Sequence, residues 1–284
     1  MTYGQYGASL AVMATIVPRE IDVDLARVPK YWIAGNAFAT AVSNGINLLF
    51  PAGERFFVRS VNKFADRVVD PVLRAQIKGF FGQEGRHARA HDRFNDVLRD
   101  QGFAIDDFLA RYEAIAKWIE ARVPAKLNLA STAAAEHFTA ILAEGAFTRP
   151  ILDRCHPEMA RLLAWHAAEE IEHRAVAFDV LQEIDPSYAL RIAGLVHATV
   201  MLGGFWLWAT VMLLRSDEMT PLDALRSLRS MPARDPIVRR IFVRGIREYI
   251  RRDFHPSHKD IDKLAAQWFA ARGLSMPEAN IEAA

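Results

Sequence analysis

Residues 83–91 read QEGRHARAH. Glu84 and His87 are three residues apart in this segment, and His91 follows His87 by four. At 3.6 residues per turn, side chains with this spacing lie on one face of an α-helix. The segment therefore predicts a helix that presents a carboxylate and two imidazoles in one direction.

Residues 165–173 read WHAAEEIEH and repeat this arrangement. Here Glu170 and His173 form the Glu-x-x-His pair, and His166 lies one turn before Glu170. A single Glu-x-x-His pair arises easily on any charged helix. Two such pairs on separate helices, each with a further histidine one turn away, are much more specific.

Two other helical stretches each carry an isolated acidic residue. Glu54 lies in the segment FPAGERFF, residues 50–57, and Glu136 lies in TAAAEHF, residues 132–138. A carboxylate among small and apolar residues is costly to bury unless it is paired or bound to a cation. We therefore interpret both residues as candidate ligands of a metal.

The combined pattern supplies four carboxylates and at least three imidazoles from four helices. Four carboxylates balance the charge of two divalent cations, and imidazoles fix the position of each metal. Oxygen and nitrogen ligands without thiolate suit iron or manganese, and zinc remains an alternative. The sequence thus predicts a site for two metal ions, with iron as the first expectation.

This pattern resembles that of the ferritin-like di-iron carboxylate family, in which two helices supply one Glu each and two supply Glu-x-x-His. Most of the chain is similar to bacterial proteins described as predicted metal-dependent hydrolases. The third histidine, one turn before the last Glu-x-x-His, resembles the extra iron ligand of the p-aminobenzoate N-oxygenase group. The resemblance implies an all-α, ferritin-like four-helix bundle with additional C-terminal helices, and it implies the metal ligands Glu54, Glu84, His87, Glu136, His166, Glu170 and His173.

Other polar residues near these positions leave alternatives open. His91 is either an additional ligand or a hydrogen-bond partner of one, and Glu144, two turns beyond Glu136, is the alternative if Glu136 is not a ligand. His137 points about 100° away from Glu136 and is expected off the metals. Glu169 and Glu172 are expected to face other directions and to pair with arginines.

Prolines divide the chain into helical stretches, and β alternation is missing. Residues 1–30 are expected to form an N-terminal strap, 31–185 the metal-binding bundle, and 186–284 an apolar helix and basic C-terminal helices packed on it. Within the bundle, helices are expected over about 31–66 (with a restart at Pro51), 71–99, 105–121, 124–147 and 157–183.

Composition excludes several classes of protein. Lys plus Arg is 35 against 34 for Asp plus Glu, so the net charge of +1 gives no reason to expect nucleic acid as a partner. The single cysteine, Cys155, excludes a disulfide or a cysteine-ligated cluster within one chain. A cytoplasmic location is expected, because no basic residue precedes Arg19 as in a signal peptide.

Residues 192–214 contain no charged side chain and are long enough to span a bilayer. Gly203, Gly204 and His197 interrupt the stretch, and the region after it is rich in arginine, which favours the cytoplasmic side. Three interpretations stay open: packing on the bundle or in a homodimer contact, peripheral membrane contact, and a true span.

The leading functional expectation is a di-iron, oxygen-activating oxidoreductase. Its partners would be O2, a small organic or acyl substrate for hydroxylation, desaturation or N-oxygenation, and an external electron donor, since the chain shows no flavin or iron–sulfur motif. The alternatives are a two-metal-dependent hydrolase and a metal-binding bundle without enzymatic activity.

Overall fold

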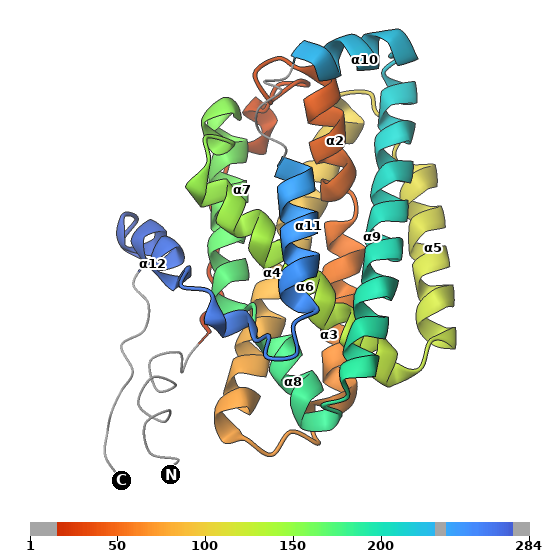
Figure 1. Cartoon of the computed structure of the whole chain (residues 1–284). Helices are drawn as coiled ribbons and strands as arrows, with labels where there is room; N and C mark the ends of the chain where they lie inside the picture. Colours follow the sequence, from red (N-terminus) through yellow and green to blue (C-terminus); the bar gives the residue numbers. More distant parts are fainter. Residues whose placement is uncertain (1–15, 231–236, 275–284) are drawn as a thin grey trace.

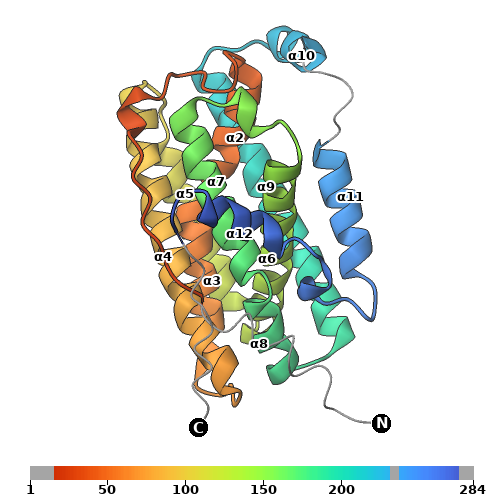
Figure 2. The same cartoon turned by 90° about the vertical axis from the view of Figure 1, so that its left-hand side faces the viewer.

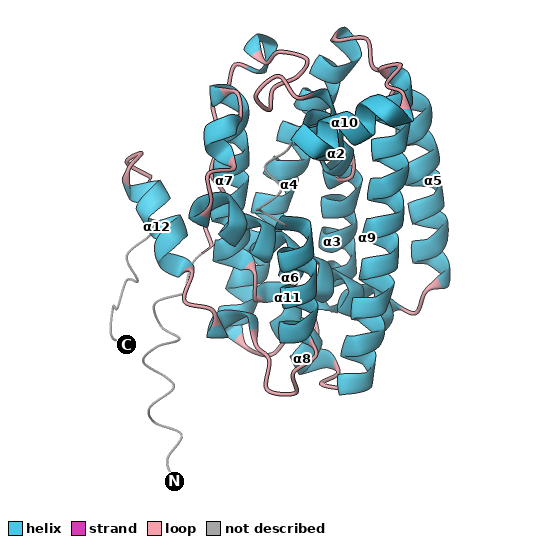
Figure 3. Ribbon diagram, turned by 45° about the horizontal axis from the view of Figure 1, so that its top comes forward, coloured by secondary structure: helices cyan, strands magenta, loops and turns pink. Residues whose placement is uncertain are grey.

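The computed structural model describes residues 16–230 and 237–274. Within these ranges the chain is all-α: Figure 3 shows helices and loops, and the β pairing is limited to one isolated bridge between Ile33 and Cys155. The predicted helical class is confirmed. The α-helices are α2 (Ala37–Asn47), α3 (Phe50–Ala65), α4 (Pro71–Asp100), α5 (Asp106–Arg122), α6 (Ala125–Thr148), α7 (Pro157–His173), α8 (Val176–Ile184), α9 (Tyr188–Ser216), α10 (Pro221–Ser230), α11 (Ile237–Tyr249) and α12 (Asp262–Ala270).

Local sequence signals set the bounds of α4, which carries the first Glu-x-x-His. Pro71 occupies the first turn, and the side chain of Asp70 accepts a hydrogen bond from the amide of Val72 (2.8 Å). After the helix, Gly102 takes a φ of +87°, which favours glycine. The sequence predicted both ends of this helix within about a residue.

The expected helix over 157–183 is instead two helices, α7 and α8, separated at Arg174 and Ala175. The guanidinium of Arg174 is buried, donates to the carbonyl of Ile171 and pairs with Asp262 at 2.6 Å. That carbonyl would otherwise accept the helical hydrogen bond from residue 175. The side chain of Arg174 thus replaces one step of the helical ladder, and the chain turns there.

A bundle of helices surrounds the predicted ligands. α3 packs against α4 and α6, and α7 packs against the same two helices. Figure 1 shows these helices side by side, with α8 at the lower end, where it contacts α3, α4 and α6. Each of the four helices that carry a predicted ligand therefore contacts two of the others.

The apolar helix α9 packs along the bundle, against α6 and α2. At Gly194 a side-chain Cβ would lie 2.4 Å from the carbonyl carbon of Ala130 in α6, so the backbones approach closely there. Near the other end, Thr210 lies against Gly45 of α2. α9 is long and apolar enough to span a membrane by length and composition, but this test alone is weak evidence.

The chain before α2 lies against the bundle, along α4 in Figure 2. Ile16 covers Gly79 and Pro18 covers Gly82, where any side chain on α4 would clash. Arg19 follows, buried between α7 and the ring of Phe269 in α12. Residues 1–15 of the expected strap, residues 231–236 and residues 275–284 lie outside the described ranges.

Candidate metal centre

The structure gathers the seven predicted ligands in the interior of the bundle. α3 supplies Glu54, α6 supplies Glu136, α4 supplies one Glu-x-x-His pair, and α7 supplies the other with its extra histidine. All seven residues are at most 5% exposed. Their nitrogen and oxygen atoms form overlapping groups of three within 4.8 Å of one another, close enough to hold metal ions.

One half of the cluster centres on His173. Its Nε2 lies 3.1 Å from Oε1 of Glu84, 3.3 Å from Oε2 of Glu136 and 3.5 Å from Oε2 of Glu170. One imidazole and three carboxylates from three helices therefore converge on one point.

The other half centres on His166 and His87. Nε2 of His166 lies 2.8 Å from Oε1 of Glu170 and 3.6 Å from Oε1 of Glu54. Nδ1 of His87 lies 3.7 Å from both Glu84 and Glu170. Glu84 and Glu170 thus take part in both halves of the cluster.

Several inward-facing atoms of this cluster lack hydrogen-bond partners. Both carboxylate oxygens of Glu54, Glu84 and Glu136 are buried without one, and so are Nδ1 of His87 and Nε2 of His173. A buried polar atom without a partner costs about 1–3 kcal/mol. Oxygen and imidazole donors that are buried, convergent and unsatisfied fit divalent cations of the iron, manganese or zinc type.

Crowding of the carboxylates changes their protonation. Burial and then the neighbouring carboxylates raise the pKa of Glu54 and of Glu84 well above the usual value. Burial likewise raises the pKa of Glu136 to about 7. The neighbouring imidazoles, His173 foremost, instead lower the pKa of Glu170 well below the usual value against the effect of burial. Without cations, three of the four carboxylates therefore disfavour charge, and metal ions would replace protons on them.

The histidines divide into neutral and charged forms. Burial lowers the pKa of His87 and of His91 well below the usual value, so both rings are neutral, the form that binds metals. Burial also opposes charging of His173, but Glu170 and Glu136 beside it raise its pKa well above the usual value. These carboxylates thus favour the protonated form of His173, whose Nε2 lies against Glu84 and Glu136.

Outer hydrogen bonds orient two of these rings. Nε2 of His87 bonds to Oε2 of Glu169 at 2.9 Å, and Nδ1 of His173 bonds to Oε1 of Gln83 at 2.8 Å. Each ring therefore keeps its other nitrogen directed into the cluster. Partners of this kind are typical of metal-binding histidines, whose orientation and basicity they set.

Arg19 joins the two outer partners. Its backbone amide donates to Glu169 at 2.9 Å, and its guanidinium donates to both oxygens of Glu172 at 2.8 and 3.0 Å. The amide nitrogen of Gln83 donates to the same Glu172 carboxylate. One continuous hydrogen-bonded chain thus runs from His87 through Arg19 to His173.

The structure places the residues whose roles the sequence left open, His91 and Glu144, differently relative to the cluster. His91 bonds to Asn47 through Nδ1 and to Nδ1 of His166 through Nε2, both at 2.6 Å. It also forms a group with Glu54 and His166 that could hold a metal ion, so both roles expected for His91 fit its position. Glu144 lies outside the cluster and pairs with Lys259 at 2.6 Å. His137 bonds to the carbonyl of Gly245 in α11, away from the cluster as expected.

Sequence reasoning missed the outer partners of the site. It predicted arginine partners for Glu169 and Glu172, and Arg19 is one, but it did not predict that Glu169 also holds His87. For Gln83 the sequence offered a weak signal, because this polar residue directly precedes the predicted ligand Glu84. The structure shows that Gln83 is fully buried, and a buried polar side chain needs a hydrogen-bond partner. For Arg19 the sequence offered no signal, because Arg19 lies 150 residues from its partner Glu169.

The geometry defines a class: a helical bundle with buried His and Glu groups that could hold metal ions. The chain belongs to the family of predicted metal-dependent hydrolases, whose sequence pattern matches residues 17–260. Membership implies a metal-dependent enzyme and supports the hydrolase alternative more directly than the oxygen-activating oxidoreductase that the sequence analysis put first. Neither a curated protein nor a solved structure matches the chain.

Proposed function

We propose that this protein is a two-metal enzyme built on a ferritin-like four-helix bundle. The observation that carries the proposal is the set of buried, unpartnered donor atoms on α3, α4, α6 and α7 that face one another. One metal would be held by His173, Glu136 and the two shared carboxylates. The other would be held by His87, His166 and Glu54 with the same shared pair, Glu84 and Glu170.

The protein's own residues have three tasks in such a site. Glu84 and Glu170 hold the two positions at a fixed separation. Gln83 and Glu169 fix the orientation of His173 and His87. The buried surroundings, including Trp165 against the ring of His87 at 4.8 Å, exclude bulk water. Bound metal ions would supply Lewis acidity and an activated water.

Hydrolysis is the first candidate reaction, because the family finding supports it. Glu84 and Glu170 take part in both halves of the cluster, and metal ions held there would supply Lewis acidity toward a carbonyl or phosphoryl oxygen and an activated water.

Oxygen activation is the second candidate, and the surroundings of Glu54 favour it. The cavity that this residue lines is walled mainly by aromatic and aliphatic side chains, which suit O2 and an apolar substrate better than a polar scissile bond. The donor set also lacks thiolate and suits iron. An external electron donor would then be required, because repeated reduction of O2 consumes electrons and the sequence shows no flavin or iron–sulfur motif.

Metal content tests the proposal directly. Elemental mass spectrometry of the purified protein should find about two iron, manganese or zinc ions per chain. Glu170→Ala and His173→Ala should each lose at least one, whereas Glu144→Gln, outside the cluster, should keep both. Unchanged metal content in both ligand variants, or no metal after reconstitution, would refute the assignment.

A second measurement separates the two reactions. The iron-loaded, reduced protein is mixed with O2 and oxygen uptake is followed, and the zinc-loaded protein is assayed anaerobically with p-nitrophenyl esters of short acyl chains. Stoichiometric oxygen uptake that Glu170→Ala abolishes would support oxygen activation. Ester cleavage that the same variant abolishes would support hydrolysis.

We further propose a cytoplasmic protein that contacts a membrane surface through α9. One face of α9 packs on the bundle, while Val196, Val200 and Leu207 on its other face are each more than half exposed. Both ends of the helix lie against α6 or α2, so a crossing would carry the charged bundle helices into the bilayer. Contact in the plane of the membrane surface avoids that cost.

A further inference from the structure

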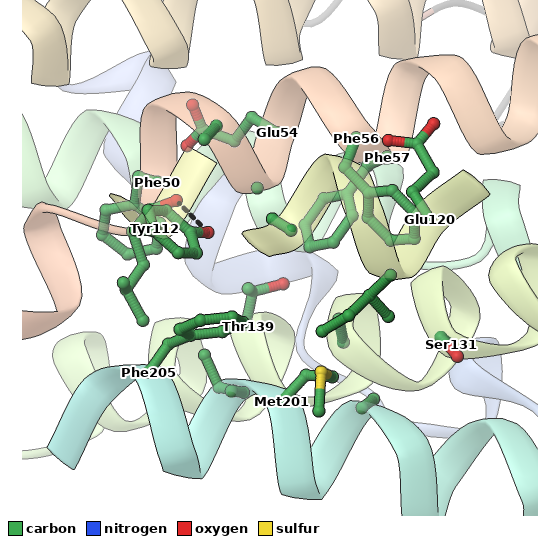
Figure 4. A pocket seen from close by; sticks show the side chains of 18 of the residues that line it. Phe50, Glu54, Phe56, Phe57, Tyr112, Glu120, Ser131, Thr139, Met201 and Phe205 are labelled. Atoms are coloured by element: carbon green, nitrogen blue, oxygen red, sulfur yellow. Dashed lines mark hydrogen bonds between the residues drawn. The ribbon is translucent and has the colours of Figure 1, made fainter. Parts of the chain in front are cut away.

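A cavity of about 140 Å³ lies between α3, α5, α6 and α9 (Figure 4). Aromatic and aliphatic side chains form most of its wall, including Phe57 of α3, Ile119 of α5, Leu142 of α6 and Phe205 of α9. An apolar space of about 150 Å³ accommodates a benzene-sized molecule. The space therefore fits the apolar part of a ligand with about six or seven carbon atoms.

One end of the cavity adjoins the candidate metal centre. Glu54, a predicted ligand, also lines the cavity, and Figure 4 shows it near Phe50 and Tyr112. The ring of Phe50 packs against the rings of His91 and His166, with centroids 4.6 and 4.8 Å away. A molecule in the cavity would thus have one end beside side chains that contact the metal donors.

At the end opposite Phe50 Figure 4 shows Ser131 of α6, and Asn128 of α6 and His197 of α9 also line the cavity. Nδ2 of Asn128 donates to the carbonyls of Glu120 and Val123, which fixes the orientation of the amide. Its Oδ1 is buried without a partner, and the residue is 1% exposed. Such an atom costs about 1–3 kcal/mol unless a ligand or water satisfies it.

Ser131 and His197 add a second acceptor at the same end. The hydroxyl of Ser131 donates to the carbonyl of Leu127 at 2.7 Å, so it accepts from Nδ1–H of His197 at 2.8 Å. This tautomer leaves Nε2 of His197 as an acceptor. Ser131 lies one turn from Asn128 on α6, and Figure 4 places it at the end opposite Phe50.

We propose that this cavity is the substrate site, and that the substrate is a small amphipathic molecule with an apolar body and a hydroxyl or amino group. The donor group would bond to Asn128 and His197, and the opposite, apolar end would lie beside Glu54. The inference rests on the proposed function for the identity of the reacting end. Binding in the cavity is independent of it.

Calorimetric titration of the metal-loaded protein with toluene and with benzyl alcohol tests this site. The two probes have similar size, and one adds a hydroxyl. Benzyl alcohol should bind about fivefold more tightly, the value of one net hydrogen bond. Ala116→Phe fills the cavity from α5 and should weaken both probes at least about tenfold. Ala114→Phe, on the exposed side of the same helix, should change neither.

Asn128→Leu isolates the polar end: toluene should still bind, and the preference for benzyl alcohol should fall to about twofold or less. If this variant does not fold, the preference in the unaltered protein and the Ala116→Phe comparison still decide. No binding of either probe, equal binding in Ala116→Phe, or no preference for benzyl alcohol would overturn the proposal. Metal content measured in parallel separates the outcomes, because loss of metal with probe binding retained contradicts only the two-metal function.

Discussion

Arg19 is the residue on which both oriented histidines depend. Its guanidinium is buried, bonds to Glu172 and lies 3.4 Å from Glu169, and these carboxylates connect to His173 and His87. Arg19→Met keeps an unbranched side chain but removes the guanidinium that lies over the ring of Phe269 and holds both carboxylates in place. We expect metal affinity to fall about 10- to 100-fold, as for other partners of metal-binding histidines. Competition with a chromophoric chelator for Co²⁺ or Zn²⁺ measures it.

Arg86→Met is the matched control for this experiment. Arg86 pairs with Glu20, the neighbour of Arg19, but the side chains of this pair are 29% and 75% exposed. Its loss should leave metal affinity within about twofold, as expected for an exposed ion pair. Equal affinity in Arg19→Met and the unaltered protein would show that the chain through Arg19 does not support the site.

The sequence predicted the candidate donors better than their supports, for a physical reason. Donors such as Glu84 and His87 are spaced by the helical period, which is visible in one segment. Supports such as Arg19 and Asn47 reach the histidines from other elements, and only the folded chain brings them there. The membership of the outer network therefore had to come from the structure.

At the scale of elements, the contact between α9 and α6 depends on a missing side chain. Gly194 faces the backbone of Ala130 at a distance that admits no Cβ, whereas Gly203 on the same helix has nothing within 4 Å. Gly194→Ala should therefore destabilise the fold by about 1–3 kcal/mol, the usual cost of overpacking. Gly203→Ala should stabilise it by about 0.5–1 kcal/mol, because alanine favours helix. Chemical denaturation measures both, and equal effects would contradict the packing.

The exposed apolar face of α9, with Val196, Val200 and Leu207, gives a second prediction at this scale. If it rests on a membrane, the protein should float with phosphatidylglycerol vesicles, and Val200→Glu with Leu207→Glu should lower the bound fraction about tenfold. Val69→Glu, at a site 77% exposed before α4, is the control and should float normally. Failure to float, together with a dimer that the double variant splits, would assign this face to a second copy of the chain instead.

Helix bounds were predictable where the stop signals are local and not where they are distant. Pro71 and Gly102 bound α4 in the sequence as in the structure. The break between α7 and α8 was missed, because it depends on Arg174 and its partner Asp262, 88 residues further on. When a helix end depends on an ion pair with a distant residue, the sequence of the helix itself does not predict that end.

The whole molecule surrounds a site whose donor atoms repel one another. Four carboxylates converge in the bundle, and burial raises the pKa of Glu54 and Glu84 well above the usual value. Several inward atoms stay unsatisfied there, so the metal-free fold bears a cost that bound cations would remove. The stability of the entire bundle should therefore be linked to metal binding.

Removal of metal should lower the unfolding temperature. A ligand present at about a thousand times its Kd adds about 4 kcal/mol to the free energy of unfolding, and two metals add more. For a chain of this size, that corresponds to a decrease of about 10 °C or more on chelation. Differential scanning calorimetry before and after treatment with EDTA measures it, and restored metal should restore the temperature. The variant Glu54→Gln with His173→Ala lacks donors from both halves, so its unfolding temperature should no longer respond to EDTA. A protein that carries two metals yet unfolds at the same temperature without them would hold those metals somewhere other than this cluster, because only ions in the core can relieve the repulsion within it.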